Sequence, residues 1–236
     1  MKWTVFDLEF TKLLPELGQP LQHDLHISCA SIMSTGDVFP QVWYELQSHS
    51  IEPGDFMSSK TVEAFISTLY EKQESGYKIV TWGGSSSDFK VLAKECLSMD
   101  AIVRNIALNS IDIPMCTCMS IGSMMGLSAA SKAIGLDLKE SGSSKDVPLI
   151  WLDLNRRHEI IQHVSNDAFA TMAVLQNLLN TGQLQWITQR GQLREWPLDA
   201  GLLTVRECLA KELPQMHFPI LPQYNAKLLA RWLLLP

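Results

Sequence analysis

The sequence of 236 residues lacks any apolar run of the roughly 20 residues that a membrane-spanning helix needs. Its start, MKWTVFDLEF, has neither the apolar segment nor the cleavage site of a secretory signal peptide. C-x-x-C spacing is missing, and Cys116 and Cys118 have no histidines nearby to complete a zinc site. We therefore expect a cytoplasmic protein with no membrane association, whose five cysteines are reduced thiols.

Positive charge is also scarce, since 19 Lys and Arg face 25 Asp and Glu and the formal net charge is −6. This balance argues against a protein that coats DNA non-specifically, because such proteins carry a basic face. It does not argue against a nuclease, since bound cations reverse the local field of a carboxylate cluster. The glycine turn at 83–87 lacks the G-x-x-x-x-G-K-[ST] pattern, so a phosphate-binding loop is not expected there.

Apolar periodicity predicts an α/β fold in which helices alternate with strands and the sheet begins with antiparallel strands. We expect strands at 3–8, 25–33, 38–44 and 77–82, and a weak strand at 104–113. We expect helices at 61–70, from 88 onward, at 126–136 and at 155–180, the last ended by Gly182.

The remaining stretches are interpreted as connections, core or appendage. Residues 34–37 suit a hairpin turn, and 11–24 and 137–148 suit loops. The Met- and Cys-rich stretch 115–125 suits packed core. We expect a main domain over 1–182 and an appendage over 183–236 that ends in a helix at 225–234.

Two carboxylates lie near the end of the first predicted strand. Side chains two apart on a strand share a face, so Asp7 and Glu9 are expected to point the same way. Their charges repel unless one is neutralised or a cation binds between them. Hard oxygen ligands suit Mg²⁺ or Mn²⁺. Taken alone, the pair also fits an exposed strand edge or turn.

Two further acids and a histidine follow on predicted helices. Asp88 opens a helix after the glycine turn, where a capping role is the alternative. Asp167 lies close to the apolar stripe of the long helix, where a buried charge needs a partner or a metal. A solvated acid is the alternative for Asp167. His163 lies one turn before it, able either to orient or deprotonate a water or to form a surface His–Asp pair.

Together these residues resemble the DEDD, or DnaQ-like, 3′–5′ exonucleases of the ribonuclease H-like superfamily. The resemblance implies an α/β fold with a ribonuclease H-like mixed sheet, antiparallel in its first strands and then parallel, flanked by helices. The similarity covers about residues 1–180 and rests on D-x-E in the first strand, an Asp after W-G-G, and His163 four residues before Asp167. The spacing, the GLSAASKAIGL helix and the following Ser/Lys loop look most like the branch related to the proofreading domains of family B DNA polymerases.

The sequence departs from the family pattern at three positions. The polymerase-related branch has a tyrosine where His163 stands, and the histidine branch has its histidine one residue earlier, where this chain has Gln162. Phe10 replaces a frequent Thr, and Gly83 replaces a frequent Asn five residues before the middle Asp. In the family both replaced residues contact the terminal nucleotide, so at these two positions the details of 3′-end binding are expected to differ from those of the family.

The resemblance implies phosphodiester hydrolysis at single-stranded DNA or RNA 3′ ends with two Mg²⁺ or Mn²⁺ ions. It implies that Asp7, Glu9, Asp88 and Asp167 hold the metal and that His163 acts on the attacking water. It places substrate contacts at Leu8, Phe10, Trp82 and Gly83, where the aromatic rings could stack on bases or simply belong to the core. Candidate phosphate contacts, each also readable as a solvated charge, are Arg104, Arg156, Arg157 and Lys145.

Two other functions remain open from the sequence. The three departures and the acidic balance also fit a catalytically degenerate nucleic-acid-binding module with the same fold. A structural subunit that assembles through 183–236 is a third possibility.

Overall fold

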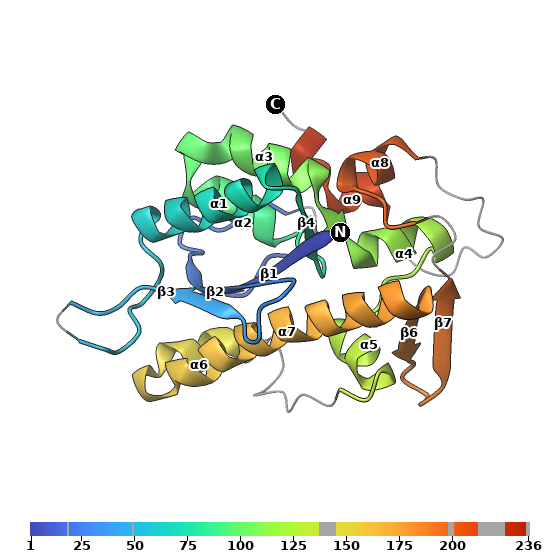
Figure 1. Ribbon diagram of the computed structural model, residues 1–236. Helices are drawn as coiled ribbons and strands as arrows, with labels where there is room; N and C mark the ends of the chain where they lie inside the picture. The colour runs from blue at the N-terminus through green and yellow to red at the C-terminus, as the bar shows by residue number, and fades with distance from the viewer. Residues whose placement is uncertain (18, 49, 137–144, 198–200, 212–224, 235–236) are drawn as a thin grey trace.

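A five-stranded mixed sheet runs through the middle of the molecule in the order β3-β2-β1-β4-β5 (Figure 1). The computed structural model describes the whole chain except residues 18, 49, 137–144, 198–200, 212–224 and 235–236. The strands are β1 Lys2–Phe10, β2 Ile27–Ser34, β3 Gln41–Tyr44, β4 Tyr77–Thr81 and β5 Ile111–Asp112. β1 pairs antiparallel with β2 and parallel with β4, so the sheet changes direction at its central strand, which confirms the predicted fold class.

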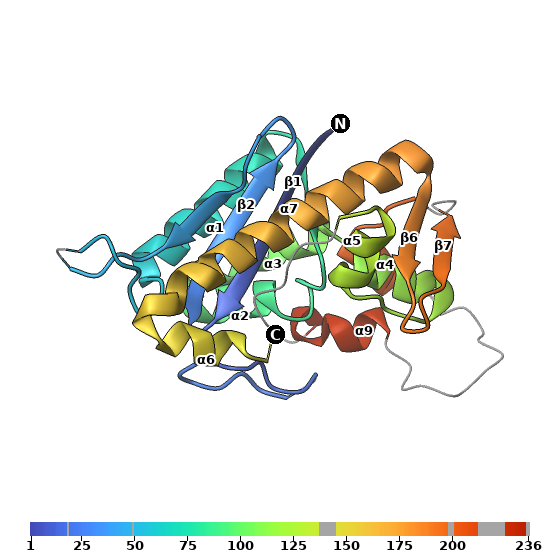
Figure 2. The ribbon, with the colours of Figure 1, turned by 90° about the horizontal axis from the view of Figure 1, so that it is seen from below.

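Helices cover both faces of this sheet (Figure 1). One face carries α1 Ser59–Glu74, α2 Asp88–Glu95 and α3 Asp100–Asn109, with the short turn η1 Leu97–Met99 between the last two. The other face carries α7 Arg157–Thr181, which crosses β1 and β2 obliquely (Figure 2). Both faces of β2 are therefore covered, and all eight of its residues are buried.

Side chains of β1 alternate between the two faces, as period-two geometry requires. Phe6, Leu8 and Phe10 join the core beneath α1 and α2. Val5 joins the core that also contains residues of α7. By the same alternation, Asp7 and Glu9 belong to the face that α7 covers.

The long helix α7 is predicted well from sequence. Apolar residues at helical spacing bury one side of it, among them Ile160, Val164 and Ala168. Gly182 ends it in a left-handed conformation with φ of 71°, and its N–H donates to the carbonyl of Leu178.

Two sequence predictions for the middle of the chain are wrong. The weak strand at 104–113 is mostly the end of α3, whose Val103, Ile106 and Ala107 are buried at helical spacing; only β5 is extended. The strand expected at 38–44 shortens to β3, because residues 38 and 39 form a bend before Pro40. The hairpin turn expected at 34–37 is present, closed by the N–H of Asp37 on the carbonyl of Ser34.

Other connections differ less from expectation. The described residues of 11–24 form no helix or strand, as predicted. Of the loop expected at 137–148, residues 137–144 lie outside the described part, and its end begins a helix. The elements between β5 and α7 are α4 Ile113–Ile121, α5 Leu127–Ala133, α6 Val147–Leu152 and η2 Leu154–Arg156. The interpretation of 115–125 as core holds for 115–119 and Met125, which are buried, but not for 120, 121, 123 and 124, which are exposed. No helix among the described residues is long and apolar enough to cross a membrane.

Residues beyond Gly182 pack against the elements that precede them. They comprise the hairpin β6 Gln183–Ile187 and β7 Leu193–Pro197, then α8 Val205–Ala210, α9 Ala226–Leu229 and η3 Arg231–Leu234. The single final helix expected at 225–234 is therefore two short turns. β6 contacts α5 and α7, while α8 contacts α3 and α4. Val205 and Leu229 belong to the same core as Ala168 and Leu175 of α7.

Arg157, the first residue of α7, ties three segments together. Only 4% of the residue is exposed. Its guanidinium donates to the carbonyls of Trp151 and Pro53, each at 2.9 Å, and to Oδ1 of Asp55 at 2.7 Å. The earlier expectation that Arg157 contacts phosphate is therefore wrong, because its donors serve the fold.

We predict that Arg157→Ala lowers the free energy of unfolding by about 1–3 kcal/mol, since it removes a buried donor from the carbonyls of Trp151 and Pro53. Among the described residues, only the carbonyl of Pro53 keeps a bond, from the side-chain amide of Gln47. Arg156→Ala is the matched control. Its side chain makes a solvent-exposed pair with Glu159 at 2.8 Å, and such pairs contribute little to stability. Urea unfolding of both variants measures the difference, and equal losses would contradict the anchoring role.

Candidate active site

A pocket of about 350 Å³ opens where β1, α2 and α7 meet. All five residues predicted to be catalytic line it: Asp7, Glu9, Asp88, His163 and Asp167. Three of the four predicted substrate contacts also line it, namely Leu8, Phe10 and Trp82. The structure therefore brings together residues separated by as many as 160 positions in the chain.

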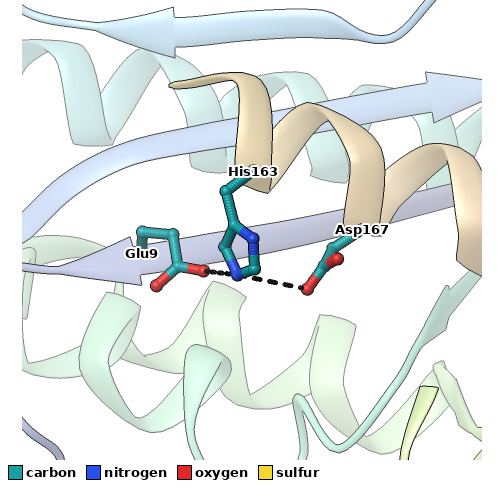
Figure 3. Close-up of side chains that lie close together, drawn as sticks. All are labelled: Glu9, His163 and Asp167. Atoms are coloured by element: carbon teal, nitrogen blue, oxygen red, sulfur yellow. Dashed lines mark ion pairs between the residues drawn. The ribbon is translucent and has the colours of Figure 1, made fainter. Parts of the chain in front are cut away.

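β1 and α7 supply the two sides of the acidic cluster. Figure 3 shows the imidazole of His163 between the carboxylates of Glu9 and Asp167. Nε2 of His163 lies 3.3 Å from Oε1 of Glu9 and 3.8 Å from Oδ2 of Asp167. One ligand atom from each of these residues lies within 4.8 Å of the others, a spacing at which a metal ion could be held.

α2 supplies the third side through its first residue, Asp88. The carboxylate is buried, with 5% of the residue exposed, and Oδ1 accepts a hydrogen bond from Oγ of Ser87 at 2.9 Å. A solvent-exposed first-turn acid would gain from the helix dipole alone. An ionised carboxylate that is buried beside other acids has a higher free energy than one in the solvent-exposed first turn of a helix. The capping alternative therefore does not account for the position of Asp88.

Asp112 fixes the turn that carries Asp88, and the sequence reasoning missed it. Its carboxylate accepts from the N–H groups of Gly83 at 3.2 Å and Ser85 at 2.9 Å, and from the hydroxyl of Ser85. The same side chain caps α4 by accepting from the N–H of Met115. The signal was available, since an Asp two residues before a proline is typical of a helix start. The misplaced strand at 104–113 obscured it.

The fourth predicted substrate contact, Gly83, lies in this turn and does not line the pocket. Its neighbour Gly84 is sterically required. A Cβ on Gly84 would lie 2.8 Å from Cβ of Thr81 and 3.0 Å from Oδ2 of Asp88. Real Cβ atoms essentially never approach another atom as closely as 2.8 Å, and 3.0 Å is tighter than most real contacts. A side chain here therefore displaces Thr81 of β4 and presses against the carboxylate of Asp88.

Burial and mutual repulsion disturb the ionisation of these acids. Burial raises the pKa of Asp7 and Glu9 well above the usual range, and the charges of Asp167 and Asp88 raise both further. Burial, together with the charge of Asp112, raises the pKa of Asp88 to about 7 against a hydrogen bond from Ser87 that lowers it. A divalent cation removes this conflict, because it stabilises the ionised carboxylates. The donor set, rich in carboxylate oxygens, fits Mg²⁺ or Mn²⁺.

The predicted aromatic contacts have little free surface. Phe10 is 7% exposed, and its ring belongs to the core beneath α1 and α2 as well as lining the pocket. Trp82 is half-buried, and its indole N–H donates to the carbonyl of Met125 at 3.0 Å.

Of the four basic candidates for phosphate contact, Lys145 lines the pocket and is exposed. Lys12, which the sequence reasoning did not single out, lines it too and pairs with Asp24. Arg104 instead bonds Asp100 and the carbonyl of Trp232, each at 2.8 Å.

No protein family model matches the sequence, and no curated protein is significantly similar to it. Among solved structures, the fold is similar to that of the family B DNA polymerase from the hyperthermophilic archaeon Pyrobaculum calidifontis, with a TM-score of 0.54 and 14% sequence identity. The match covers 75% of this chain and 24% of the polymerase chain, so this protein corresponds to about a quarter of that enzyme. The likeness shows the fold, which is ribonuclease H-like.

We predict that Gly84→Ala weakens divalent-ion binding by about 10–100-fold, because it moves a carboxylate of the pocket without removing it. Gly126→Ala is the matched control, since a Cβ there meets nothing within 4 Å. Titration calorimetry with Mn²⁺ compares the two. Affinity unchanged by Gly84→Ala would show that the position of Asp88 does not matter for the ion.

The raised pKa of Asp88 predicts how stability depends on pH. Because the folded protein holds a proton that the unfolded chain releases near its ordinary pKa of 3.8, metal-free protein loses stability as the pH rises from about 4 to about 7. Asp88→Asn removes this titration, so its stability should fall less over the same range. Mg²⁺ should restore stability near pH 7 to the unaltered protein and much less to the variant.

Urea unfolding in chelator at several pH values, with and without Mg²⁺, tests this prediction. Parallel stability curves for the two proteins would contradict it.

Proposed function

We propose that this protein is a metal-dependent 3′–5′ exonuclease that hydrolyses phosphodiester bonds at single-stranded nucleic-acid ends. The observation that carries the proposal is the pocket itself. Four carboxylates from three separate elements, Asp7, Glu9, Asp88 and Asp167, line it with one imidazole. Buried acids of one sign destabilise a fold unless a ligand compensates them, so their convergence favours a cation-dependent role.

In this proposal the four carboxylates hold two Mg²⁺ or Mn²⁺ ions. When bound, such ions activate water and stabilise the leaving oxygen of the phosphodiester. The protein supplies the rigid positions of the ligands. β1 fixes Asp7 and Glu9 through its pairing with β2 and β4, and Asp112 fixes the turn before Asp88.

His163 is the group to which we assign a proton-transfer or water-positioning role. Its Nε2 faces the pocket beside Glu9, and both side chains are largely buried, which restricts the orientation of the ring. A histidine is suited to accept a proton near neutral pH. Lys145 and Lys12, at the same pocket, would attract the phosphates of the strand. Leu8, Phe10 and Trp82 would contact the terminal nucleotide.

The fold comparison supports a nucleic-acid substrate, since the matched protein is a DNA polymerase. We further propose that the protein is located in the cytoplasm, a reducing environment, because all five cysteines are buried free thiols.

We predict release of mononucleotides from the 3′ end of a single-stranded oligonucleotide when Mg²⁺ or Mn²⁺ is present. Asp7→Asn should abolish turnover, since it removes a charge at the centre of the cluster, and His163→Ala should lower the rate by about 10²–10⁴-fold. Glu63→Gln, an exposed acid on α1, is the control and should leave the rate unchanged. If a 3′-labelled substrate stays intact with either metal over about pH 6–9, the activity proposal is wrong.

A catalytically degenerate binding module is the second candidate. It is favoured by the three departures from the family pattern, and by the position of Gly83, whose N–H is directed to Asp112 rather than to the pocket. Calorimetry separates the candidates, because an enzyme should bind divalent ions in a way that Asp88→Asn and Asp167→Asn weaken. A module without function at this pocket should show no such binding.

A further inference from the structure

A second pocket, of about 460 Å³, adjoins the candidate active site. The two pockets share Leu14 and Ser87 as lining residues, so they lie side by side. Three segments distant in sequence form it: the loop after β1, the start of α2, and the C-terminal turns α9 and η3.

The C-terminal wall of this pocket is fixed to the turn that carries Asp88. The indole N–H of Trp232 donates to the carbonyl of Ser85 at 2.8 Å, and Arg104 donates to the carbonyl of Trp232 at 2.8 Å. Trp232 is 8% exposed and belongs to the core beneath α2. The last described residues of the chain are therefore held beside the acidic cluster.

Two cations line this pocket, and among the described residues neither has a carboxylate partner. Lys90, on α2, donates to the carbonyl of Gln19 at 3.0 Å, and Arg231, on η3, is exposed. Within the part of the chain that the structure describes, neither forms a salt bridge. Burial lowers the pKa of Lys90, a cost that an anionic ligand would offset. Glu16 is the acid that lines the same pocket.

A chain with net charge −6 here presents unpaired positive charge next to its candidate catalytic pocket. The regularly spaced phosphates of a nucleic-acid strand suit such a surface, because Lys and Arg bind phosphate through their positive charge and their N–H donors. Exposed Leu14 and Leu17 on the loop offer apolar contact to sugars and bases. A peptide is the other occupant that an apolar pocket could take, but it does not explain two cations beside the path of a phosphodiester strand.

We propose that this second pocket binds the sugar-phosphate backbone of a single strand upstream of its 3′-terminal nucleotide. The proposal rests on the function proposed above, which puts the 3′ end at the acidic cluster. Lys90 and Arg231 contact phosphates, and the C-terminal segment thereby becomes part of the substrate-binding surface. Affinity then rises with strand length until the pocket is filled.

Steady-state kinetics on two substrates tests the proposal. The p-nitrophenyl ester of thymidine 5′-monophosphate reaches the acidic cluster alone, whereas an oligonucleotide of about eight residues also reaches the second pocket. Lys90→Glu and Arg231→Glu should each raise KM for the oligonucleotide about tenfold and leave both constants for the ester within about twofold. Each should also reduce the slope of log affinity against log salt by about 0.7, the value for one single-strand phosphate contact.

Two further variants sharpen the comparison. Lys227→Glu, an exposed residue of α9 outside the pocket, should behave as the unaltered protein. Glu16→Gln should lower KM for the oligonucleotide, since it removes the opposing charge. Because Arg231 is exposed, its reversal leaves the fold intact even if that of Lys90 disturbs the contact with Gln19.

If both substrates are hydrolysed but neither charge reversal changes the KM for the oligonucleotide, the pocket proposal alone is overturned. A peptide is then the alternative occupant. Hydrolysis of neither substrate by the unaltered protein overturns the proposed function instead. In that case, fluorescence anisotropy of a labelled oligonucleotide tests separately whether the second pocket binds a nucleic-acid strand. Binding that both reversals weaken supports it, and binding that neither affects rejects it.

Discussion

Repulsion among four clustered carboxylates, of which Asp88 is buried and the other three are partly buried, is the constraint on which the rest of this structure depends. Asp7, Glu9 and Asp88 lie in one pocket with Asp167, and each of the first three has its pKa raised by burial and by neighbouring charge. A cluster of this kind costs folding free energy at neutral pH unless cations occupy it. Its presence at the edge of a well-formed core therefore favours a functional origin over a structural one.

Strand pairing and buried hydrogen bonds fix the elements that carry the clustered carboxylates. β1 is paired on both sides, and α7 is anchored by the buried side chain of Arg157. The turn before Asp88 is held by Asp112, from the middle of the chain, and by Trp232, among its last described residues. These supports restrict where the carboxylates can move. Such restriction is what a site must have if it is to hold ions at defined positions.

Sequence patterns correctly predicted those parts of the fold that depend on interactions between residues close together in the chain. Alternation along β1 correctly assigned Asp7 and Glu9 to one face, and helical periodicity together with Gly182 defined α7. The strand expected at 104–113 failed because apolar, β-branched residues suit either element, and their packing against α1 and α2 decided for α3. Contacts such as Trp232 with Ser85 join residues 147 positions apart, and no local pattern carries that information.

The most direct test of the account is a crystal grown with Mn²⁺ and a mononucleotide and measured for anomalous scattering. The account predicts two peaks among Asp7, Glu9, Asp88 and Asp167, with the phosphate of the nucleotide bound to them. Anomalous density absent from this pocket at saturating Mn²⁺, or present only elsewhere on the protein, would contradict it.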